Sequence, residues 1–223
     1  MRSAAVLVAA GRGERLGVGG PKALMALGGR TLLEHALAGL RVAGIEAVVV
    51  VHPPGLGDTV AQLAPDTLRV EGGETRTASV RAGVAALDDD IEVVAVHDAA
   101  RALTPAEVIA AAVAAVTGDV LAAAPALAVA DTLKRVEDGV VVGTVDRAGL
   151  VAVQTPQVVR REVLQAALAR GGEATDDLAL VQALLAAGEV RGRVVTVAGS
   201  VRGLKITWPE DLELAEALCR APV

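Results

Sequence analysis

Short apolar runs alternate with longer segments of helical period along this chain, and no other feature constrains the fold as strongly. Strands joined by helical crossovers pair in parallel, so the alternation predicts βαβ units. The runs are apolar throughout, as expected for strands that helices cover on both faces. They span residues 4–10, 46–51, 67–70, 92–97, 120–124 and 193–198. We therefore predict an α/β fold, with one domain over residues 1–223 built on a doubly wound, mainly parallel sheet.

Two of the helical segments begin with a capping box, in which a Thr and a Glu three residues later satisfy free backbone amides. The two boxes are Thr31 with Glu34 and Thr104 with Glu107. In the second, Pro105 also suits the first position of a helix. Acidic residues at 176–177 and 210–211 fall in predicted first turns, where the helix dipole favours negative charge. These acids therefore have a structural explanation.

One segment, residues 128–153, breaks the alternation. It contains β-rich runs on either side of Asp138-Gly139, a dipeptide that favours a tight hairpin turn, and it has no helical stripe. A hairpin of this kind buries little against its own domain. We therefore predict that residues 128–153 form a protruding β-hairpin arm.

The composition argues against nucleic acid and membrane partners. The formal net charge is −6, and the chain has no Phe or Tyr and only one Trp, so base stacking has little support. The most apolar later stretch, residues 108–130, is interrupted by Gly118, Asp119 and Pro125, which argues against a membrane span. Cys219 is the single cysteine, which fits a reducing compartment. We expect a cytoplasmic protein.

Glycines and charged residues gather after three of the predicted strands, at the edge where doubly wound sheets bind ligands. Glycine allows close backbone approach, cations suit phosphate groups, and a carboxylate suits a metal ion. The three groups are Gly11, Gly13, Arg15, Gly17, Gly19, Gly20 and Lys22; then Glu71, Gly72, Gly73, Glu74 and Arg76; then His97, Asp98 and Arg101. This arrangement predicts a nucleotide site.

The first of these loops matches neither common phosphate-binding motif. A dinucleotide fingerprint needs glycine where Leu16 stands, and Gly17 comes one place late. A P-loop needs Gly-Lys-Ser/Thr where residues 21–23 read Pro-Lys-Ala. What remains is a glycine-rich loop with two cations, Arg15 and Lys22, seven residues apart. The alternative is a flexible loop with incidental solvated charges.

The other two groups also have simpler explanations. An ionised Asp98 at the end of a buried strand is costly unless its charge meets water, a cation or another partner. A helix cap or an ion pair with Arg101 would satisfy it as well as a metal ion would. Taken alone, His97 is better explained as a buried histidine with its hydrogen bonds satisfied than as a ligand or a base. The segment 72–80 reads as a turn and a helix start. Arg76 and Ser79 share one face of that helix, where they could instead contact a planar base that approaches Gly73, the turn glycine just before it.

Taken in order, these pieces resemble the 2-C-methyl-D-erythritol 4-phosphate cytidylyltransferases of the non-mevalonate isoprenoid pathway. The matching stretches run from residue 9 to residue 212 and read AAGRGERLGVGGPK, LEHAL, GGETRTASV, VHDAAR, DTLKR, TVDRAGL, QTPQ, TDD and GSVRGLKITWPEDL. The resemblance implies a Rossmann-like sheet of nucleotidyltransferase type. It also implies transfer of a cytidylyl group from CTP to methylerythritol phosphate, with release of pyrophosphate.

The resemblance assigns residues to the nucleotide half of the site. Arg15, Lys22 and Asp98 would be catalytic, and Asp98 would help to hold a Mg²⁺ ion. The residues that would bind the nucleotide are Ala9, Ala10, Gly11, Gly13, Gly73, Glu74, Arg76 and Ser79.

The resemblance also assigns the second substrate and a partner. The residues that would bind methylerythritol phosphate are Arg101, Thr132, Arg147, Thr155 and Lys205. In this family the arm crosses to a second subunit, which implies a homodimer whose sites are built from two chains. From the residues alone, Lys205 could instead sit on a sheet edge and Thr155 could be a turn residue before Pro156.

Two other functions stay open from the sequence. A related enzyme could transfer the cytidylyl group to ribitol 5-phosphate or another polyol phosphate, because the nucleotide half would look the same. A nucleotide-binding regulatory protein would have no need of Arg15, Lys22 and Asp98 together, so their presence favours an enzyme. We expect no fused second enzyme in this chain.

Overall fold

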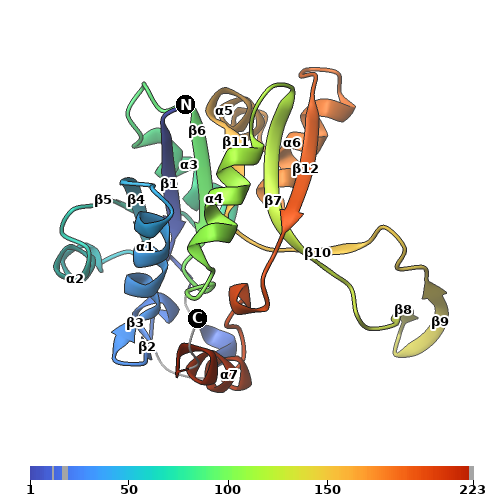
Figure 1. Cartoon of the computed structure of the whole chain (residues 1–223), viewed down its shortest axis with the longest axis horizontal. Helices are drawn as coiled ribbons and strands as arrows, with labels where there is room; N and C mark the ends of the chain where they lie inside the picture. Colours follow the sequence, from blue (N-terminus) through green and yellow to red (C-terminus); the bar gives the residue numbers. More distant parts are fainter. Residues whose placement is uncertain (12, 17–19, 221–223) are drawn as a thin grey trace.

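The computed structural model describes residues 1–11, 13–16 and 20–220, and its central sheet confirms the mainly parallel α/β architecture (Figure 1). Strand β1 (Ser3–Val8) lies at the centre and pairs in parallel with β4 (Ala47–His52) and β6 (Val93–Asp98). Strand β5 (Leu68–Glu71) pairs in parallel with β4. The order β5-β4-β1-β6 is that of a doubly wound nucleotide-binding half.

The other half of the sheet contains two strands that the sequence predicted and two that it did not. The two predicted strands, β7 (Val120–Ala128) and β12 (Arg193–Ala198), pair in parallel. Between β6 and β7 lies the antiparallel β11 (Gln157–Arg160), and β10 (Val151–Val153) pairs antiparallel with the end of β7. The first residue and the last three residues assigned to the arm thus belong to the main sheet.

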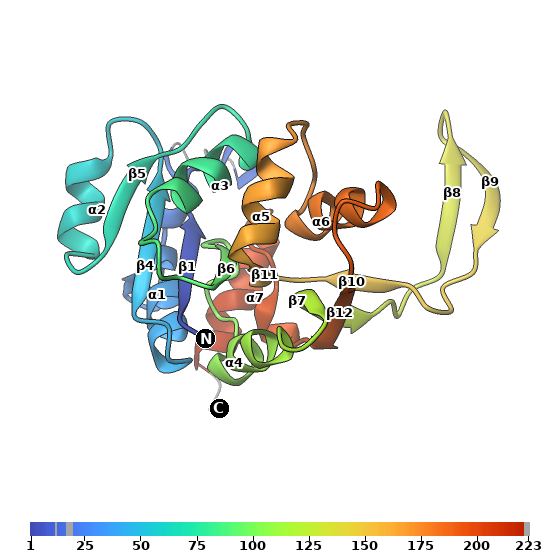
Figure 2. The ribbon, with the colours of Figure 1, turned by 90° about the horizontal axis from the view of Figure 1, so that it is seen from above.

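Helices cover both faces of this sheet (Figure 2). On one face lie α1 (Leu32–Val42), α2 (Gly57–Leu63) and α4 (Ala106–Ala115). On the other lie α3 (Arg76–Ala85), α5 (Arg161–Ala169) and α6 (Asp177–Ala186). Among the helices in the described part of the chain, none is long and apolar enough to cross a membrane.

The two cores explain why the strands are apolar throughout. Along β1, Ala4 and Val6 belong to the core under α3 and α5, while Ala5 and Leu7 belong to the core under α1 and α4. Helix α3 packs very close to β1 at Gly83, where an added Cβ would lie only 2.4 Å from a Val6 methyl. Glycine at this position therefore permits the close approach. Aliphatic side chains fill these cores without aromatic residues.

Helix α7 (Pro209–Arg220) and several short elements lie at the carboxyl edge of the sheet (Figure 1). Helix α7 packs there on a third apolar cluster that includes Leu16 and Ile206. The remaining elements are η1 (Glu14–Leu16), η2 (Lys22–Leu24), β2 (Ala26–Leu27), β3 (Arg30–Thr31) and η3 (Val201–Gly203).

One of the two predicted capping boxes is confirmed and the other is wrong. The Thr31 hydroxyl accepts a hydrogen bond from the Glu34 amide at 3.2 Å, and the Glu34 carboxylate accepts one from the Thr31 amide at 2.7 Å. The Thr104 hydroxyl instead donates to the Arg101 carbonyl oxygen at 2.9 Å. That bond closes the turn after β6, so α4 begins only at Ala106, with Pro105 as its N-cap.

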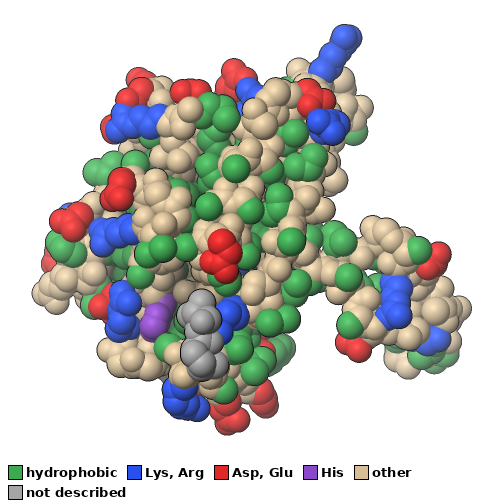
Figure 3. All heavy atoms as spheres, in the orientation of Figure 1, with side chains coloured by type: hydrophobic (Ala, Val, Ile, Leu, Met, Phe, Trp, Pro, Cys, Tyr) green, Lys and Arg blue, Asp and Glu red, His purple; other side chains and the backbone are tan. Residues whose placement is uncertain are grey.

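The arm, residues 128–153, contains the predicted hairpin. Strands β8 (Leu133–Glu137) and β9 (Val140–Val145) form a separate two-stranded sheet. Asp138 and Gly139 both have positive φ, at 47° and 80°, as a type I′ turn requires. Figures 1 and 3 show the hairpin standing out from the body as a separate lobe. An isolated two-stranded hairpin is marginally stable, and valines of this one are exposed: Val136, Val140, Val141 and Val142.

Candidate functional site

A cavity of about 1040 Å³ opens at the carboxyl ends of the parallel strands, where the sequence analysis placed the site. The loops after β1, β5 and β6 all contribute to its wall. The predicted site residues that line it are Ala9, Ala10, Gly11, Gly13, Arg15, Lys22, Gly73, Glu74, Arg76, Ser79, Asp98 and Lys205. Gly17 and Gly19 lie outside the described residues. Four separate stretches of the sequence thus meet in one cavity, because Lys205 comes from a segment other than the three loops.

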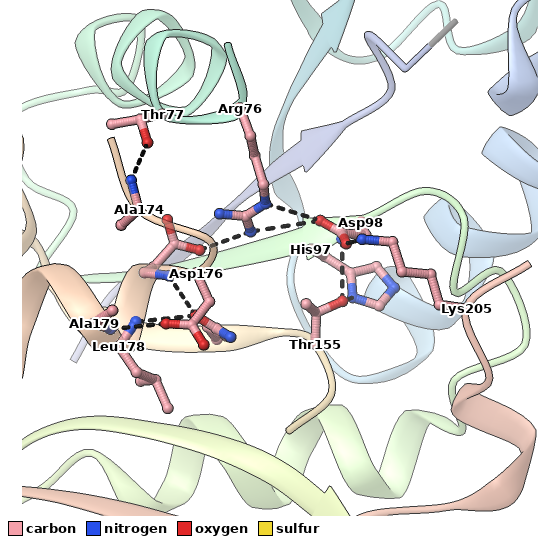
Figure 4. A network of polar contacts seen from close by, with 12 residues as sticks. Arg76, Thr77, His97, Asp98, Thr155, Ala174, Asp176, Leu178, Ala179 and Lys205 are labelled. Carbon is pink, nitrogen blue, oxygen red and sulfur yellow. Dashed lines mark hydrogen bonds and ion pairs between the residues drawn. The ribbon is translucent and has the colours of Figure 1, made fainter. Parts of the chain in front are cut away.

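Asp98, at the end of β6, is the centre of an ion-pair network in this cavity (Figure 4). Its Oδ2 lies 2.7 Å from Lys205 Nζ, and its Oδ1 accepts from Arg76 Nε and Nη2, each at 3.4 Å. Burial opposes the charged form, but the two cations outweigh it and lower the pKa of Asp98 to about 2. Asp98 is therefore ionised at neutral pH. The pair with Arg101 that the sequence left open does not form, because Arg101 donates to the carbonyl oxygens of Gly203 and Val153.

Thr155 supports Asp98 from behind the cavity wall. Its hydroxyl accepts from the Asp98 amide at 3.1 Å and lies 3.0 Å from His97 Nδ1 (Figure 4). Burial lowers the pKa of His97 to about 4, so the imidazole is neutral, and the Thr155 hydroxyl can donate to its Nδ1. The sequence grouped Thr155 with substrate-binding residues, whereas in this structure the side chain is buried and holds the end of β6.

The network continues to Asp177, which the sequence analysis explained only by the helix dipole. Asp177 is the first residue of α6, and its Oδ2 accepts from Arg76 Nη2 at 2.8 Å. Against the effect of burial, Asp177 and Asp98 raise the pKa of Arg76, which stays charged. The signal that could have revealed Asp177 is the second adjacent acid, because Asp176 alone caps α6 by accepting from the Ala179 amide.

The first loop carries Lys22 and Arg15 to the same cavity. Lys22 begins η2, and its amide donates to the Gly11 carbonyl oxygen at 3.3 Å. Gly13 has φ 72°, and a Cβ there would lie 3.3 Å from Lys22 Cβ, so glycine lets the loop fold closely over the lysine. Burial, then Lys205 and Arg15, lower the pKa of Lys22. The crowding of like charges prepares the cavity for a polyanion.

The segment before α7 completes the wall. Lys205 and Thr207 line the cavity, and the buried Ile206 between them anchors the segment by donating its amide to the Ala100 carbonyl oxygen at 2.9 Å. Trp208 follows, and the Arg15 guanidinium lies over its ring, 5.7 Å from the centroid. Thr207 and Trp208 had no part in the predicted site.

The glycines after β5 shape the other end of the cavity. Arg76 and Ser79 both line it from α3, which agrees with the predicted shared face. A Cβ added at Gly73 would lie 2.5 Å from Ala78 Cβ, and one at Gly72 would lie 2.6 Å from Ala10 Cβ. Glycine is therefore required at both positions by packing within the protein.

Two of the predicted substrate residues lie far from this cavity. Thr132 and Arg147 are exposed on the arm, where Arg147 donates to the Ala130 carbonyl oxygen. Within one chain, Lys205 lines the cavity, whereas Thr132 and Arg147 do not. Of the residues predicted for the second substrate, Arg101 and Thr155 lie beside the wall, within the hydrogen-bonded structure around Asp98.

Comparisons with known proteins show the family to which this chain belongs. The family model for 2-C-methyl-D-erythritol 4-phosphate cytidylyltransferase matches residues 3–221. The enzyme of that name from Frankia casuarinae is 50% identical, over 97% of this chain and 81% of its own length. The one from Rhodococcus opacus is 48% identical, over 96% of this chain and 93% of its own. The crystal structure of the Thermus thermophilus enzyme superposes with a TM-score of 0.81 at 38% identity, covering 97% of this chain and 98% of that one. This chain belongs to the 2-C-methyl-D-erythritol 4-phosphate cytidylyltransferase family.

Proposed function

We propose that this chain transfers the cytidylyl group of CTP to 2-C-methyl-D-erythritol 4-phosphate. The products are 4-diphosphocytidyl-2-C-methyl-D-erythritol and pyrophosphate, and the step belongs to isoprenoid precursor biosynthesis. The observation that carries the proposal is the convergence of Arg15, Lys22 and Lys205 on the cavity that holds the ionised Asp98, in a chain of this family. Cations there suit a triphosphate. The residues assigned to the base, Gly73 and Ser79, line the same cavity.

The chemistry needs positioning and charge neutralisation more than acid–base catalysis. A phosphate oxygen of the acceptor attacks the α-phosphorus of CTP, and the bond to the pyrophosphate oxygen breaks. Negative charge then grows on the α-phosphate oxygens and on the leaving group. In our proposal Arg15 and Lys22 stabilise this charge from the first loop. The attacking phosphate is already ionised, so no general base is required.

The residues at Asp98 fit a Mg²⁺ ion that arrives with the triphosphate. In the described part of the chain, no group of three or more His, Cys, Asp or Glu side chains could hold a metal by itself. Mg²⁺ is usually bound through one or two carboxylates together with substrate phosphates, and Asp98 supplies one carboxylate in the cavity wall. Such an ion would neutralise phosphate charge. We propose that Asp98 holds it and that Lys205 keeps Asp98 in place before CTP binds.

We also propose that the acceptor site is shared between two chains of a cytoplasmic homodimer. Thr132 and Arg147 stand on an arm that reaches away from its own cavity, so a second chain is the body they can serve. Arg147 suits the acceptor phosphate as a charge-assisted donor, with Lys205 on the other side. Arg101 and Thr155 would act from beside the cavity wall.

The acceptor is tested by measuring pyrophosphate release from CTP and Mg²⁺ with each of two acceptors. We expect kcat/KM for methylerythritol phosphate to exceed that for ribitol 5-phosphate by roughly 100-fold, because buried polar groups made for one polyol are left unpaired by another. If pyrophosphate is released with ribitol 5-phosphate and not with methylerythritol phosphate, then ribitol 5-phosphate is the acceptor and our proposal is wrong. CTP binding without turnover of any polyol phosphate would indicate a regulatory protein.

Trp208 offers a direct measurement of nucleotide binding, because it is the only Trp in a chain without Phe or Tyr. Binding of CTP should draw the Arg15 guanidinium from the Trp208 ring toward the triphosphate, so the emission should change saturably during a CTP titration. The Arg15→Ala variant, which lacks that cation, should show little of the change. Equal responses in the two proteins would mean that the ring senses something other than Arg15. Free N-acetyltryptophanamide corrects for absorption by CTP.

A further inference from the structure

Asp177 is a buried carboxylate to which the proposed mechanism gives no role. Asp177 is only 1% exposed and does not line the cavity. Its Oδ1 has no hydrogen-bond partner among the described residues. Its Oδ2 contacts Arg76, which extends from α3 toward Asp98 in Figure 4. A single guanidinium therefore stands between a buried carboxylate and the carboxylate of the site.

The two contacts of Arg76 are unequal. A charge-assisted N–H···O bond is normally about 2.7–2.9 Å long. The contact from Arg76 to Asp177 has this length, at 2.8 Å, whereas both contacts from Arg76 to Asp98 are long, at 3.4 Å. Arg76 is thus bound firmly to the remote carboxylate and weakly to the carboxylate in the cavity.

Asp177 is itself held in a fixed position. Gln157, at the start of the central strand β11, accepts from the Asp177 amide at 2.6 Å and from the Leu178 amide at 3.0 Å through its Oε1. The start of α6 is therefore tied to the sheet. A carboxylate anchored in this way can keep a guanidinium from moving farther toward the cavity.

We propose that Asp177 is a positioning residue that holds Arg76 back from Asp98, so that an Asp98 oxygen stays available to a divalent cation bound with the triphosphate. The inference rests on the proposed function for the identity of that ligand. If Asp177 carries no charge, the Arg76 guanidinium stays charged in a poorly solvated site, and Asp98 is then its only carboxylate partner among the described residues. Arg76 would then close on Asp98 and compete with the cation.

The test is the Asp177→Asn variant, with Mn²⁺ as the probe and saturating CTP. The free Mn²⁺ signal in electron paramagnetic resonance gives the affinity without turnover. We expect the Kd for Mn²⁺ to rise roughly tenfold or more, in line with the effect of residues that support a metal ligand from behind. The half-saturating Mg²⁺ concentration for pyrophosphate release should rise in parallel, while kcat at saturating Mg²⁺ falls less.

Asp176→Ala is the matched control. Asp176 is the adjacent residue and caps the same helix, but no described contact joins it to Arg76. This variant should lower the melting temperature and leave the Kd for Mn²⁺ unchanged. If Asp177→Asn lowers kcat at every Mg²⁺ concentration with an unchanged Kd for Mn²⁺, the role is structural and the inference is overturned.

A double variant keeps the inference testable if Asp177→Asn folds poorly. Arg76→Gln combined with Asp177→Asn removes the competing cation together with the buried carboxylate. Its Kd for Mn²⁺ should return to within about threefold of wild type, a residual factor of less than about 1 kcal/mol. A double variant that binds Mn²⁺ as weakly as Asp177→Asn contradicts the competition. Absence of CTP-dependent Mn²⁺ binding in the wild type would instead overturn the metal assignment in the proposed function, and this inference with it.

Discussion

Replacing Lys22 by Ala should lower the turnover of pyrophosphate release by about 10²- to 10³-fold, the loss typical when one donor to a developing negative charge is removed. The Kd for CTP should rise much less, because Arg15 and Lys205 still face the triphosphate. Lys22 is half-buried at the cavity wall, where its charge is screened less than on the surface. Initial rates give the turnover, and Trp208 emission gives the Kd.

Lys22→Arg is the control for this prediction, and pH separates charge from shape. Burial and the neighbouring Lys205 and Arg15 lower the pKa of Lys22, so its charge is lost at a lower pH than that of an exposed lysine. Wild-type turnover should therefore fall at alkaline pH as Lys22 deprotonates. In Lys22→Arg the side chain stays charged, so this fall should move to higher pH. An alkaline fall at the same pH in both proteins, or an unimpaired Lys22→Ala, would remove Lys22 from the mechanism.

The strands that could be predicted are those whose own sequence determines their burial. Residues 4–10 and 92–97 are apolar on both faces, and they became β1 and β6 at the centre of the sheet. The strand β11 was missed because its four residues, Gln157–Arg160, carry only two aliphatic side chains and gain their place from pairing with β6 and β7. Tertiary pairing, rather than local pattern, determines such a strand.

The same limit applies to single polar side chains. Thr31 and Thr104 stand in the same local pattern, but only Thr31 caps a helix, because the Thr104 hydroxyl is taken by the Arg101 carbonyl oxygen. Asp177 reads as an ordinary acid of a first helical turn. Its contact with Arg76 joins residues 101 positions apart and depends on how the start of α6 and α3 are placed on the same face of the sheet. Local sequence carries no information on that placement.

The nucleotide half of the site was predictable for a different reason. Strand order brings the carboxyl ends of neighbouring parallel strands to one edge, so residues placed after β1, β5 and β6 had to meet. In the proposed function the acceptor half also depends on the arm, and the arm of one chain does not reach its own cavity. Sequence alone can therefore assign Thr132 and Arg147 to the acceptor only by resemblance, and it cannot say in which chain's cavity they would act.

Mixed dimers should decide which chain the arm serves. Lys22→Ala damages the body of a site, and Arg147→Ala damages the arm that completes it. If arms are exchanged, a dimer of one chain of each kind pairs an intact body with an intact arm in one of its two sites. The other site carries both defects. Dimers purified through two different tags should then recover about half of the wild-type activity, as the two-fold symmetry requires, although each parent is nearly inactive. If each arm instead serves its own chain, no site in the mixed dimer is intact, and activity stays at the level of the parents. Recovery thus depends on arm exchange and not on dimerisation alone, so inactive mixed dimers would refute the shared site.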